Sequence, residues 1–326
     1  MESLTGNYTR EDAVSMIKPA DSDGQKHYSY PAIDQFHAIV DTRHANREAV
    51  ELFNGFFATK SRLDCDATME FISRDLSVYV DVTLGWELNG YDALKAVWAK
   101  YMPTWGEGKS YPTRILGEVT NGTGGVVLEF TDTPELFGGD LRVLAAVEVV
   151  DGKITRWADC WDSARYDGKL YKTLKVPAIE PPLALRIKPA ASHATARICD
   201  VSSRLVETLS RGDTEGAAAL FSYDGVLEDL CLNMKIVGLP AIARYLARAS
   251  HKSPYGRGVQ LGHVVGGDIG GGFEWATTSS EIRTGVASLA FNAEGKITRA
   301  NMVYDSRDLS AASRNELAAL TLEPVQ

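Results

Sequence analysis

An acid lies within an apolar, aromatic run in the stretch Val78-Tyr79-Val80-Asp81-Val82-Thr83-Leu84-Gly85-Trp86-Glu87-Leu88-Asn89-Gly90. Valines alternate with Tyr79 and Asp81, and this period of two is typical of a β-strand. Tyr79 and Asp81 therefore share one face of the expected strand. Gly90 is expected to open a helix over residues 91–102, because Pro103 follows at its end.

Composition restricts the kind of partner. The chain has 326 residues, of which 44% are hydrophobic and 24% charged, so it is long enough for two domains with packed cores. Its net charge is -9 and its pI is about 5.3, and the sequence contains no basic stripe. Nucleic acid and anionic membrane are therefore poor candidates, and a small apolar or neutral molecule is the better one.

Cysteine usage and the N-terminal sequence bear on the compartment. The four cysteines are scattered, without CxxC pairs or clustered histidines, which disfavours a disulfide framework and a metal site. Residues 1–30 lack the apolar core of a signal peptide, and no run reaches the roughly 18 apolar residues of a membrane span. We expect a cytoplasmic protein that needs neither metal nor cofactor.

Periodicity divides the chain into segments. Residues 1–32 are predicted to form an N-terminal arm with a short helix from Arg10 to Ile17. Residues 33–171 are predicted to form a first domain, with amphipathic helices up to residue 57, a short helix after Asp64, and then strands near 113–118, 125–131, 142–150 and 154–162. Asn121-Gly122 and Asp151-Gly152 are expected as hairpin turns. Helices followed by an antiparallel sheet indicate an α+β cone with a pocket between the two layers.

The second half of the sequence repeats the first. A proline-containing linker is expected over residues 172–194, a second domain over 195–310 and a tail over 311–326. Asp81 precedes Gly90 by nine residues, and Asp229 precedes Gly238 by nine. The segment Asp151-Gly152-Lys153-Ile154-Thr155-Arg156 recurs as Glu294-Gly295-Lys296-Ile297-Thr298-Arg299. Two copies of one fold are therefore predicted, and we expect them to pack together as an internal pseudo-dimer.

The opening of the second copy carries a family resemblance. Residues 204–238, beginning Arg-Leu-Val-Glu-Thr-Leu-Ser-Arg-Gly-Asp, resemble the nuclear transport factor 2 superfamily. That superfamily includes ketosteroid isomerases, SnoaL-like polyketide cyclases and limonene-type epoxide hydrolases. The resemblance covers roughly residues 35–170 and 195–310. It implies two tandem cone-shaped α+β barrels, each made of helices packed on a curved antiparallel sheet.

Two templates within the superfamily imply different roles for the acids. In ketosteroid isomerases the general base stands nine residues before the glycine that opens the third helix, which matches Asp81 and Asp229. The tyrosine of that family is not matched, because its position is Leu205 in the second copy and falls near Phe57 in the first.

In limonene-type epoxide hydrolases a Tyr-x-Asn pair holds water and two aspartates flank the epoxide. The counterparts here are Tyr79 and Asp81, then Asp132, and then Asp162. The sequence departs from the template twice, with Asp81 in place of the asparagine and Phe130 in place of an arginine. Tandem polyether epoxide hydrolases resemble the layout of two copies. Asp159 is expected on the strand face opposite Asp162.

These residues make up the predicted site. Asp81, Asp132, Asp162 and Tyr79 are the catalytic candidates, while Trp86, Phe130, Trp157, Trp161 and Tyr304 are candidates for pocket wall or core. The second copy offers Asp229, Asp305 and Glu228, although Glu228 should point away from Asp229 in a regular strand. Thr277 stands at the position of Asp132, so the first copy has the fuller set. Each acid has a simpler interpretation as a turn, a cap or a solvated side chain.

An acid in apolar surroundings favours acid/base chemistry, because burial raises the pKa of a carboxyl group toward neutrality. Two such acids in one pocket are driven apart in pKa, so that one can donate a proton while the other accepts one. Three functions remain open. The chain could open an epoxide in a polyketide- or terpenoid-like molecule, by water or by an internal hydroxyl. It could instead isomerise or cyclise a substrate by removing a proton next to a carbonyl, or bind a ligand without catalysis.

Overall fold

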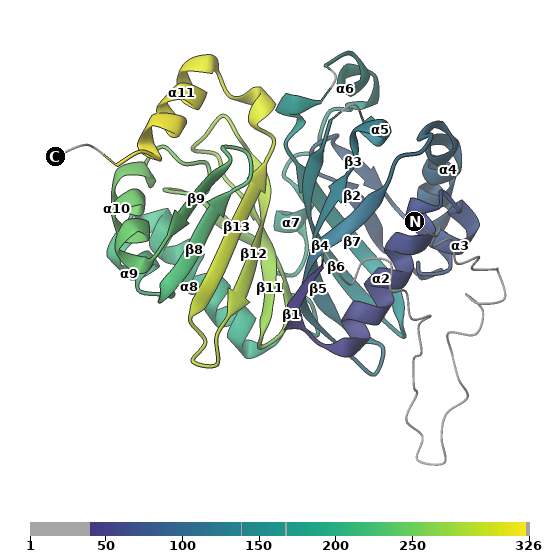
Figure 1. The fold of residues 1–326 in the computed structure, drawn as a ribbon, viewed down its shortest axis with the longest axis horizontal. Helices are drawn as coiled ribbons and strands as arrows, with labels where there is room; N and C mark the ends of the chain where they lie inside the picture. The colour runs from purple at the N-terminus through teal and green to yellow at the C-terminus, as the bar shows by residue number, and fades with distance from the viewer. Residues whose placement is uncertain (1–39, 138, 167, 324–326) are drawn as a thin grey trace, which may run out of the picture.

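The computed structural model describes residues 40–323 except 138 and 167. The expected arm over residues 1–32, with its helix from Arg10 to Ile17, lies outside this part of the chain. The two halves of the sequence build two β-sheets that lie next to each other in the middle of the molecule, and most helices cover their outer sides (Figure 1). The expected α+β class with two tandem units is confirmed, but the strand order closes neither sheet into a barrel.

The first half contains a seven-stranded sheet in the order β1-β4-β5-β6-β7-β2-β3. Its strands are β1 (Asp41–Ala45), β2 (Val78–Asp81), β3 (Trp86–Leu88), β4 (Ser110–Thr120), β5 (Thr123–Asp132), β6 (Leu141–Val150) and β7 (Lys153–Trp161). Its helices are α2 (Arg47–Ser61), α3 (Cys65–Met69), α4 (Tyr91–Tyr101), η2 (Met102–Thr104), α5 (Pro134–Phe137), η3 (Ser163–Arg165) and α6 (Gly168–Leu174).

One expected helix begins later than its apolar spacing suggested. Residues Asp41–Ala45 form β1, which pairs in parallel with β4, instead of continuing a helix. The cause is Asn46, whose side-chain oxygen accepts a hydrogen bond from the Ala49 amide and caps α2. Asp64 caps α3 in the same way, as expected. Both expected hairpin turns have φ above zero at both residues, at 52° and 74° for Asn121-Gly122 and at 51° and 71° for Asp151-Gly152.

The second half contains a six-stranded sheet in the order β10-β11-β12-β13-β8-β9. Its strands are β8 (Phe221–Asp229), β9 (Met234–Val237), β10 (Gln260–Gly266), β11 (Gly270–Ala276), β12 (Thr284–Phe291) and β13 (Ile297–Tyr304). Its helices are α8 (Ala196–Arg211), α9 (Thr214–Ala218), α10 (Leu239–Ala249), η4 (Ser306–Asp308) and α11 (Ala311–Leu320).

The spacing of nine residues between acid and glycine has a structural cause in both halves. Asp81 ends β2 and Asp229 ends β8, and each strand turns back through a short hairpin to a helix. Gly90 and Gly238 stand immediately before these helices with φ of 87° and 92°, a backbone region that favours glycine. The spacing is therefore a property of the fold and does not by itself mark a catalytic residue.

The two sheets face each other through apolar side chains. Val127, Leu144 and Ala146 of the first sheet belong to the same buried cluster as Val286 and Leu289 of the second. The opposite face of the first sheet packs on α2 and α4 through a separate cluster that is rich in aromatic residues. The first half therefore keeps its own interior on the side away from the interface.

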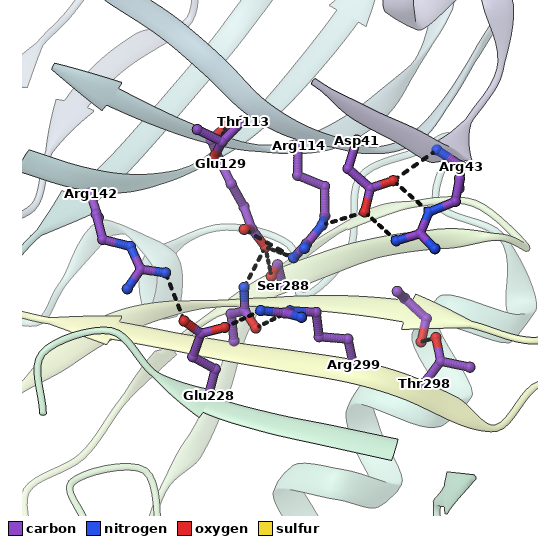
Figure 2. Close-up of polar contacts among 12 residues, drawn as sticks. Asp41, Arg43, Thr113, Arg114, Glu129, Arg142, Glu228, Ser288, Thr298 and Arg299 are labelled. Atoms are coloured by element: carbon purple, nitrogen blue, oxygen red, sulfur yellow. Dashed lines mark hydrogen bonds and ion pairs between the residues drawn. The ribbon is translucent and has the colours of Figure 1, made fainter. Parts of the chain in front are cut away.

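Polar pairs cross this interface within the apolar contact (Figure 2). Glu129 Oε1 accepts hydrogen bonds from Ser288 Oγ at 2.7 Å and from Asn301 Nδ2 at 2.8 Å. The Arg142 guanidinium lies 2.8 Å from Glu228 Oε1. Outside that view, Arg156 pairs with Glu274 at 2.6 Å.

The expected linker and tail contain helices. Residues 183–186 form α7 (Leu183–Arg186), and Ala190 makes an isolated parallel bridge to Val264. The segment expected as a tail contains α11, which buries Leu317. In both places short apolar contacts order a segment whose composition shows little periodicity.

Candidate active site

A cavity opens in the first half, on the face of the sheet covered by α2 and α4. It holds about 870 Å³ of empty space, including its opening to solvent. Three strands contribute acids to it, because β2 provides Asp81, β5 provides Asp132 and β7 provides Asp159. The remaining wall is mostly apolar and aromatic, including Trp86, Trp98, Tyr101, Trp105, Phe130, Leu141, Val143, Trp161, Leu170 and Leu174.

Asp81 and Asp159 stand next to each other at this wall. They are direct partners in the parallel pairing of β2 with β7, and both side chains line the cavity. Asp81 Oδ1 accepts a hydrogen bond from the Leu84 amide at 2.7 Å, and its Oδ2 accepts one from Trp161 Nε1 at 3.2 Å. Burial raises the pKa of Asp81 to about 6 because the charged form loses its hydration.

Of the two carboxyl oxygens of Asp159, only one accepts hydrogen bonds from described residues. Its Oδ2 accepts hydrogen bonds from the Tyr79 hydroxyl at 3.0 Å and from Trp157 Nε1 at 2.7 Å. Its Oδ1 is buried and has no hydrogen-bond partner among the described residues. Burial, together with the neighbouring Asp81 charge, raises the pKa of Asp159 well above its usual range. Of the two neighbouring acids, Asp159 is therefore the one that keeps a proton more readily, and Asp81 is the one that ionises first.

Tyr79 lines the cavity between aromatic neighbours. Its ring stacks on Trp157 at 6.1 Å between centroids and meets Trp98 edge-on at 5.9 Å. Burial raises the pKa of the Tyr79 hydroxyl well above its usual range, so it remains a hydrogen-bond donor. Tyr79 and Asp81 lie on the same strand face, as their alternation indicated.

Asp132 stands at a separate part of the wall, beside a lysine. It ends β5 and is only 6% exposed. Lys60 Nζ, from the last turn of α2, lies 3.7 Å from Asp132 Oδ1. Strand β6 separates β5 from β7, and Asp132 pairs with Leu141 whereas Asp159 pairs with Ala145, so the two acids are apart both across and along the strands.

Asp162 and Asp305 cap short helices and form hydrogen bonds between the two halves. Both were expected to be acids of the site, but neither lines the cavity under α2 and α4, although Asp305 lines a second cavity that also reaches Asp81. Asp162 caps η3 and its Oδ1 accepts hydrogen bonds from the amide and hydroxyl of Ser306 in the other half. Asp305 caps η4 and accepts the reciprocal hydrogen bonds from Ser163. Each acid follows the last residue of its strand, so it leaves the sheet and reaches the partner half.

In the second copy, the corresponding acid is enclosed by hydrogen-bond donors of the protein itself. Asp229 is fully buried, and each of its oxygens accepts two hydrogen bonds. The donors are the amides of Cys231 and Leu232 and the hydroxyls of Tyr255 and Tyr304. The strand partner of Asp229 is Met302, where Asp81 has Asp159.

The remaining candidates divide between wall, core and interface. Trp86, Phe130 and Trp161 line the cavity, whereas Trp157 lies behind Tyr79 and is 2% exposed. Glu228 lies between Arg142 and Arg299 at the interface, on the side away from Asp229 as expected. Two cavity residues were missed as site residues. The strand alternation favours either Asp159 or Asp162 without deciding between them, and Lys60 carries no signal because a lysine in the last turn of an amphipathic helix is common.

Within residues 40–323, no helix is both long and apolar enough to cross a bilayer. In the same part of the chain, no group of three or more histidine, cysteine, aspartate and glutamate side chains is arranged to hold a metal ion.

The first half of the chain is similar to a known protein family. Residues 47–169 match the family model of the limonene-1,2-epoxide hydrolase catalytic domain. This segment contains Lys60, Tyr79, Asp81, Asp132 and Asp159. A comparison with curated proteins found no match.

Solved structures of low sequence identity are similar to parts of the chain. An NTF2-like protein of Cytophaga hutchinsonii has 12% identity and a TM-score of 0.29, covering 35% of this chain and 90% of its own. A candidate ketosteroid isomerase of Kribbella flavida has 19% identity and a TM-score of 0.30, covering 41% and 82%. A candidate polyketide cyclase of Sinorhizobium meliloti has 18% identity and a TM-score of 0.28, covering 33% and 92%. In the first half, the segment that carries the cavity and its acids is therefore similar to the limonene-1,2-epoxide hydrolase catalytic domain.

Proposed function

We propose that the first half is a cofactor-independent acid/base enzyme that opens an epoxide in an apolar polyketide- or terpenoid-like molecule. One observation carries the proposal. Asp81 and Asp159 stand side by side in one cavity, and the buried Oδ1 of Asp159 has no hydrogen-bond partner among the described residues. A buried carboxyl oxygen without a partner is costly, so a ligand that completes its hydrogen bonding binds favourably.

The acids of β2 and β7 are suited to hold and activate a nucleophile. Neutral Asp159 can donate from Oδ1 to the oxygen of a water molecule or of a substrate hydroxyl. Ionised Asp81 can accept the proton from that oxygen as it attacks an epoxide carbon. Tyr79 fixes the orientation of Asp159 by its hydrogen bond at 3.0 Å.

The opposite part of the wall is suited to receive the epoxide oxygen. Attack at carbon from one side breaks the C–O bond on the other, and the departing oxygen must take up a proton. Asp132 and Lys60 lie there, on the part of the wall formed by the end of β5 and the last turn of α2.

A second candidate is isomerisation or cyclisation by proton abstraction next to a carbonyl, with Asp81 as the base. It is supported by the pKa of Asp81 near 6, which suits a general base at neutral pH. A single base is sufficient for that chemistry, and it leaves Asp159 without a defined task. Epoxide opening uses both acids and agrees with the family match over residues 47–169.

The test compares the wild type with Asp81→Asn on limonene 1,2-epoxide, on a hydroxy-epoxide and on a cyclic enone. We expect a diol or a cyclic ether from the epoxides and a fall in kcat/KM of roughly 100-fold or more in the variant. The exposed Asp92 provides a matched control, and Asp92→Asn should retain wild-type turnover. In the wild type, kcat/KM should rise as pH rises through about 6, because Asp81 must lose its proton to act as base. Turnover of the enone alone would favour the isomerase, and no turnover of any probe would favour a binding module.

We also infer that residues 33–171 and 195–310 are two domains of one fold that pair as an internal pseudo-dimer, with only the first catalytic. The reciprocal contacts of Asp162 with Ser306 and of Asp305 with Ser163 support this arrangement. The four donors that saturate Asp229 support a structural task for the second copy.

A further inference from the structure

Lys60 is a buried cation at the cavity wall. Its side chain is 10% exposed, although lysine is rarely buried unless its charge is compensated. The Nζ atom lies 5.0 Å from the centroid of the Phe130 ring, 5.9 Å from that of Phe57 and 6.0 Å from that of Trp105. Aromatic faces at such distances attract a cation, so the three rings hold the ammonium group at one point of the wall.

The pairing of Lys60 with Asp132 is incomplete. Their closest atoms are 3.7 Å apart, which is beyond hydrogen-bond distance. Asp132 Oδ1 has no hydrogen-bond partner in the described part of the chain, although it is buried. The N–H groups of Lys60 therefore remain available to a ligand oxygen in the cavity.

We propose that Lys60 is the catalytic proton donor to the substrate oxygen and that Asp132 is a positioning residue that holds the ammonium group at this point of the wall. This inference rests on the proposed function and deepens it. As the nucleophile bonds to carbon, the C–O bond breaks and its electron pair passes to the oxygen, which takes a proton from the ammonium group. Lys60 regains a proton from the protonated Asp81 through solvent, so no proton is gained or lost over the cycle.

The same geometry restricts the substrate class. The donor is a cation inside an aromatic cage, and three carboxyl groups share the cavity. A substrate with a carboxylate or phosphate would meet these acids, whereas a neutral molecule with an ether or carbonyl oxygen meets the ammonium alone. The site therefore takes an uncharged, largely apolar molecule whose oxygen becomes negative only during the reaction.

A probe that reports on the donor without turnover is 4-dimethylaminobenzaldehyde. Its absorption moves to longer wavelength when its carbonyl oxygen accepts a hydrogen bond or faces a cation. We expect this shift on binding to the wild type and its loss in Lys60→Met, which keeps the length of the side chain and fits among the aromatic rings. Lys60→Arg should restore much of the shift. Lys109→Met is the matched control, because Lys109 Nζ donates to the Ser61 carbonyl at 3.0 Å and does not line the cavity.

Kinetics on limonene 1,2-epoxide provide the second readout. Loss of one donor to a developing oxyanion lowers kcat roughly 100-fold to 1,000-fold, and we expect Lys60→Met to fall in that range. Asp132→Asn should lower kcat less, because it removes the neighbouring charge and leaves the donor. Thermal unfolding shows whether each variant folds, and Lys60→Gln replaces Lys60→Met if the latter does not.

Two outcomes would overturn the assignment. An unchanged absorption shift in Lys60→Met would show that another group faces the ligand oxygen. If Lys60 forms an imine with the aldehyde, borohydride reduces it to a stable secondary amine. Such a trapped adduct would show that the Lys60 amine is neutral and acts as a nucleophile. If the shift depends on Lys60 while no epoxide is turned over, the donor assignment stands and the proposed epoxide opening fails.

Discussion

At the scale of single residues, Asp81 and Asp229 show how neighbours decide the task of an acid. Both end the corresponding strand of their half, and burial raises the pKa of each to about 6. Asp81 has a carboxyl neighbour and a cavity, whereas Asp229 has four donors and no free oxygen. A raised pKa is therefore insufficient to identify a catalytic acid in this fold.

Asp229→Asn should change how stability depends on pH. The pKa of Asp229 rises from 3.8 to about 6 on folding, so the folded state binds the proton more tightly than the unfolded state does. The stability this provides is complete below about pH 3.8 and is lost as pH rises through 6. About two pKa units correspond to roughly 3 kcal/mol. Asparagine keeps the two amide contacts and can donate to both tyrosine hydroxyls, so the variant should lack this dependence.

The measurement is urea unfolding of the wild type and of Asp229→Asn at several values between pH 4 and pH 7. As pH rises, the free energy of unfolding of the wild type should fall relative to that of the variant. Asp92→Asn, at an exposed site, serves as the control for a surface acid. A constant difference across this range would contradict the assignment.

At the scale of elements, β7 brings two acids to different places. Asp159 alternates with Trp157 and Trp161 inside the strand, which directs all three toward the helix-covered side of the sheet. Asp162 follows the last residue of β7, so alternation no longer applies to it. Asp159 thus faces the cavity, whereas Asp162, three residues later, lies at the interface between the halves.

Matched truncations at these two positions should separate activity from stability. Asp159→Ala should lower kcat/KM on limonene 1,2-epoxide roughly 100-fold, because it removes the group that holds the nucleophile. Asp162→Ala should retain at least about a third of kcat and lower stability by about 1–2 kcal/mol, through loss of a cap and of two contacts with Ser306. The measurements are steady-state kinetics and thermal unfolding, and a large loss of kcat in Asp162→Ala would return that acid to the site.

At the scale of the whole molecule, the two sheets are joined by an apolar contact that contains buried ion pairs. Arg156 and Glu274 come from different halves, and each side chain is 5% exposed. A buried pair adds little net stability, but removing one partner leaves the other charge uncompensated. The interface should therefore tolerate loss of the pair much better than loss of either member.

A double-mutant cycle tests this interface. Glu274→Met should lower the free energy of unfolding by about 3–5 kcal/mol, whereas the double variant Arg156→Met with Glu274→Met should recover most of it. Urea unfolding measures each variant. Equal losses in the single and double variants would mean that Arg156 finds compensation elsewhere.

Much of the molecule follows from local sequence patterns. The alternation around Tyr79 and Asp81, the Asn121-Gly122 turn and the repeated spacing from acid to glycine each depend on neighbours in the chain, and the structure agrees with them. The strand over Asp41–Ala45 was missed because its ladder partner, β4, lies far along the sequence. Local propensity does not report such pairing.

The composition of the candidate site was decided by tertiary contacts. The strand β2 and its acid are encoded locally, since a strand alternates its faces with a period of two. Asp159 lies beside Asp81 because β2 and β7 pair in parallel across about 80 residues of sequence. Lys60 lies beside Asp132 because α2 packs against β5. The sequence by itself determined two copies of an α+β fold, each with a buried acid at a strand end. Only the tertiary structure decided which acid faces a cavity, because register and packing between distant segments set the neighbours of each carboxyl group.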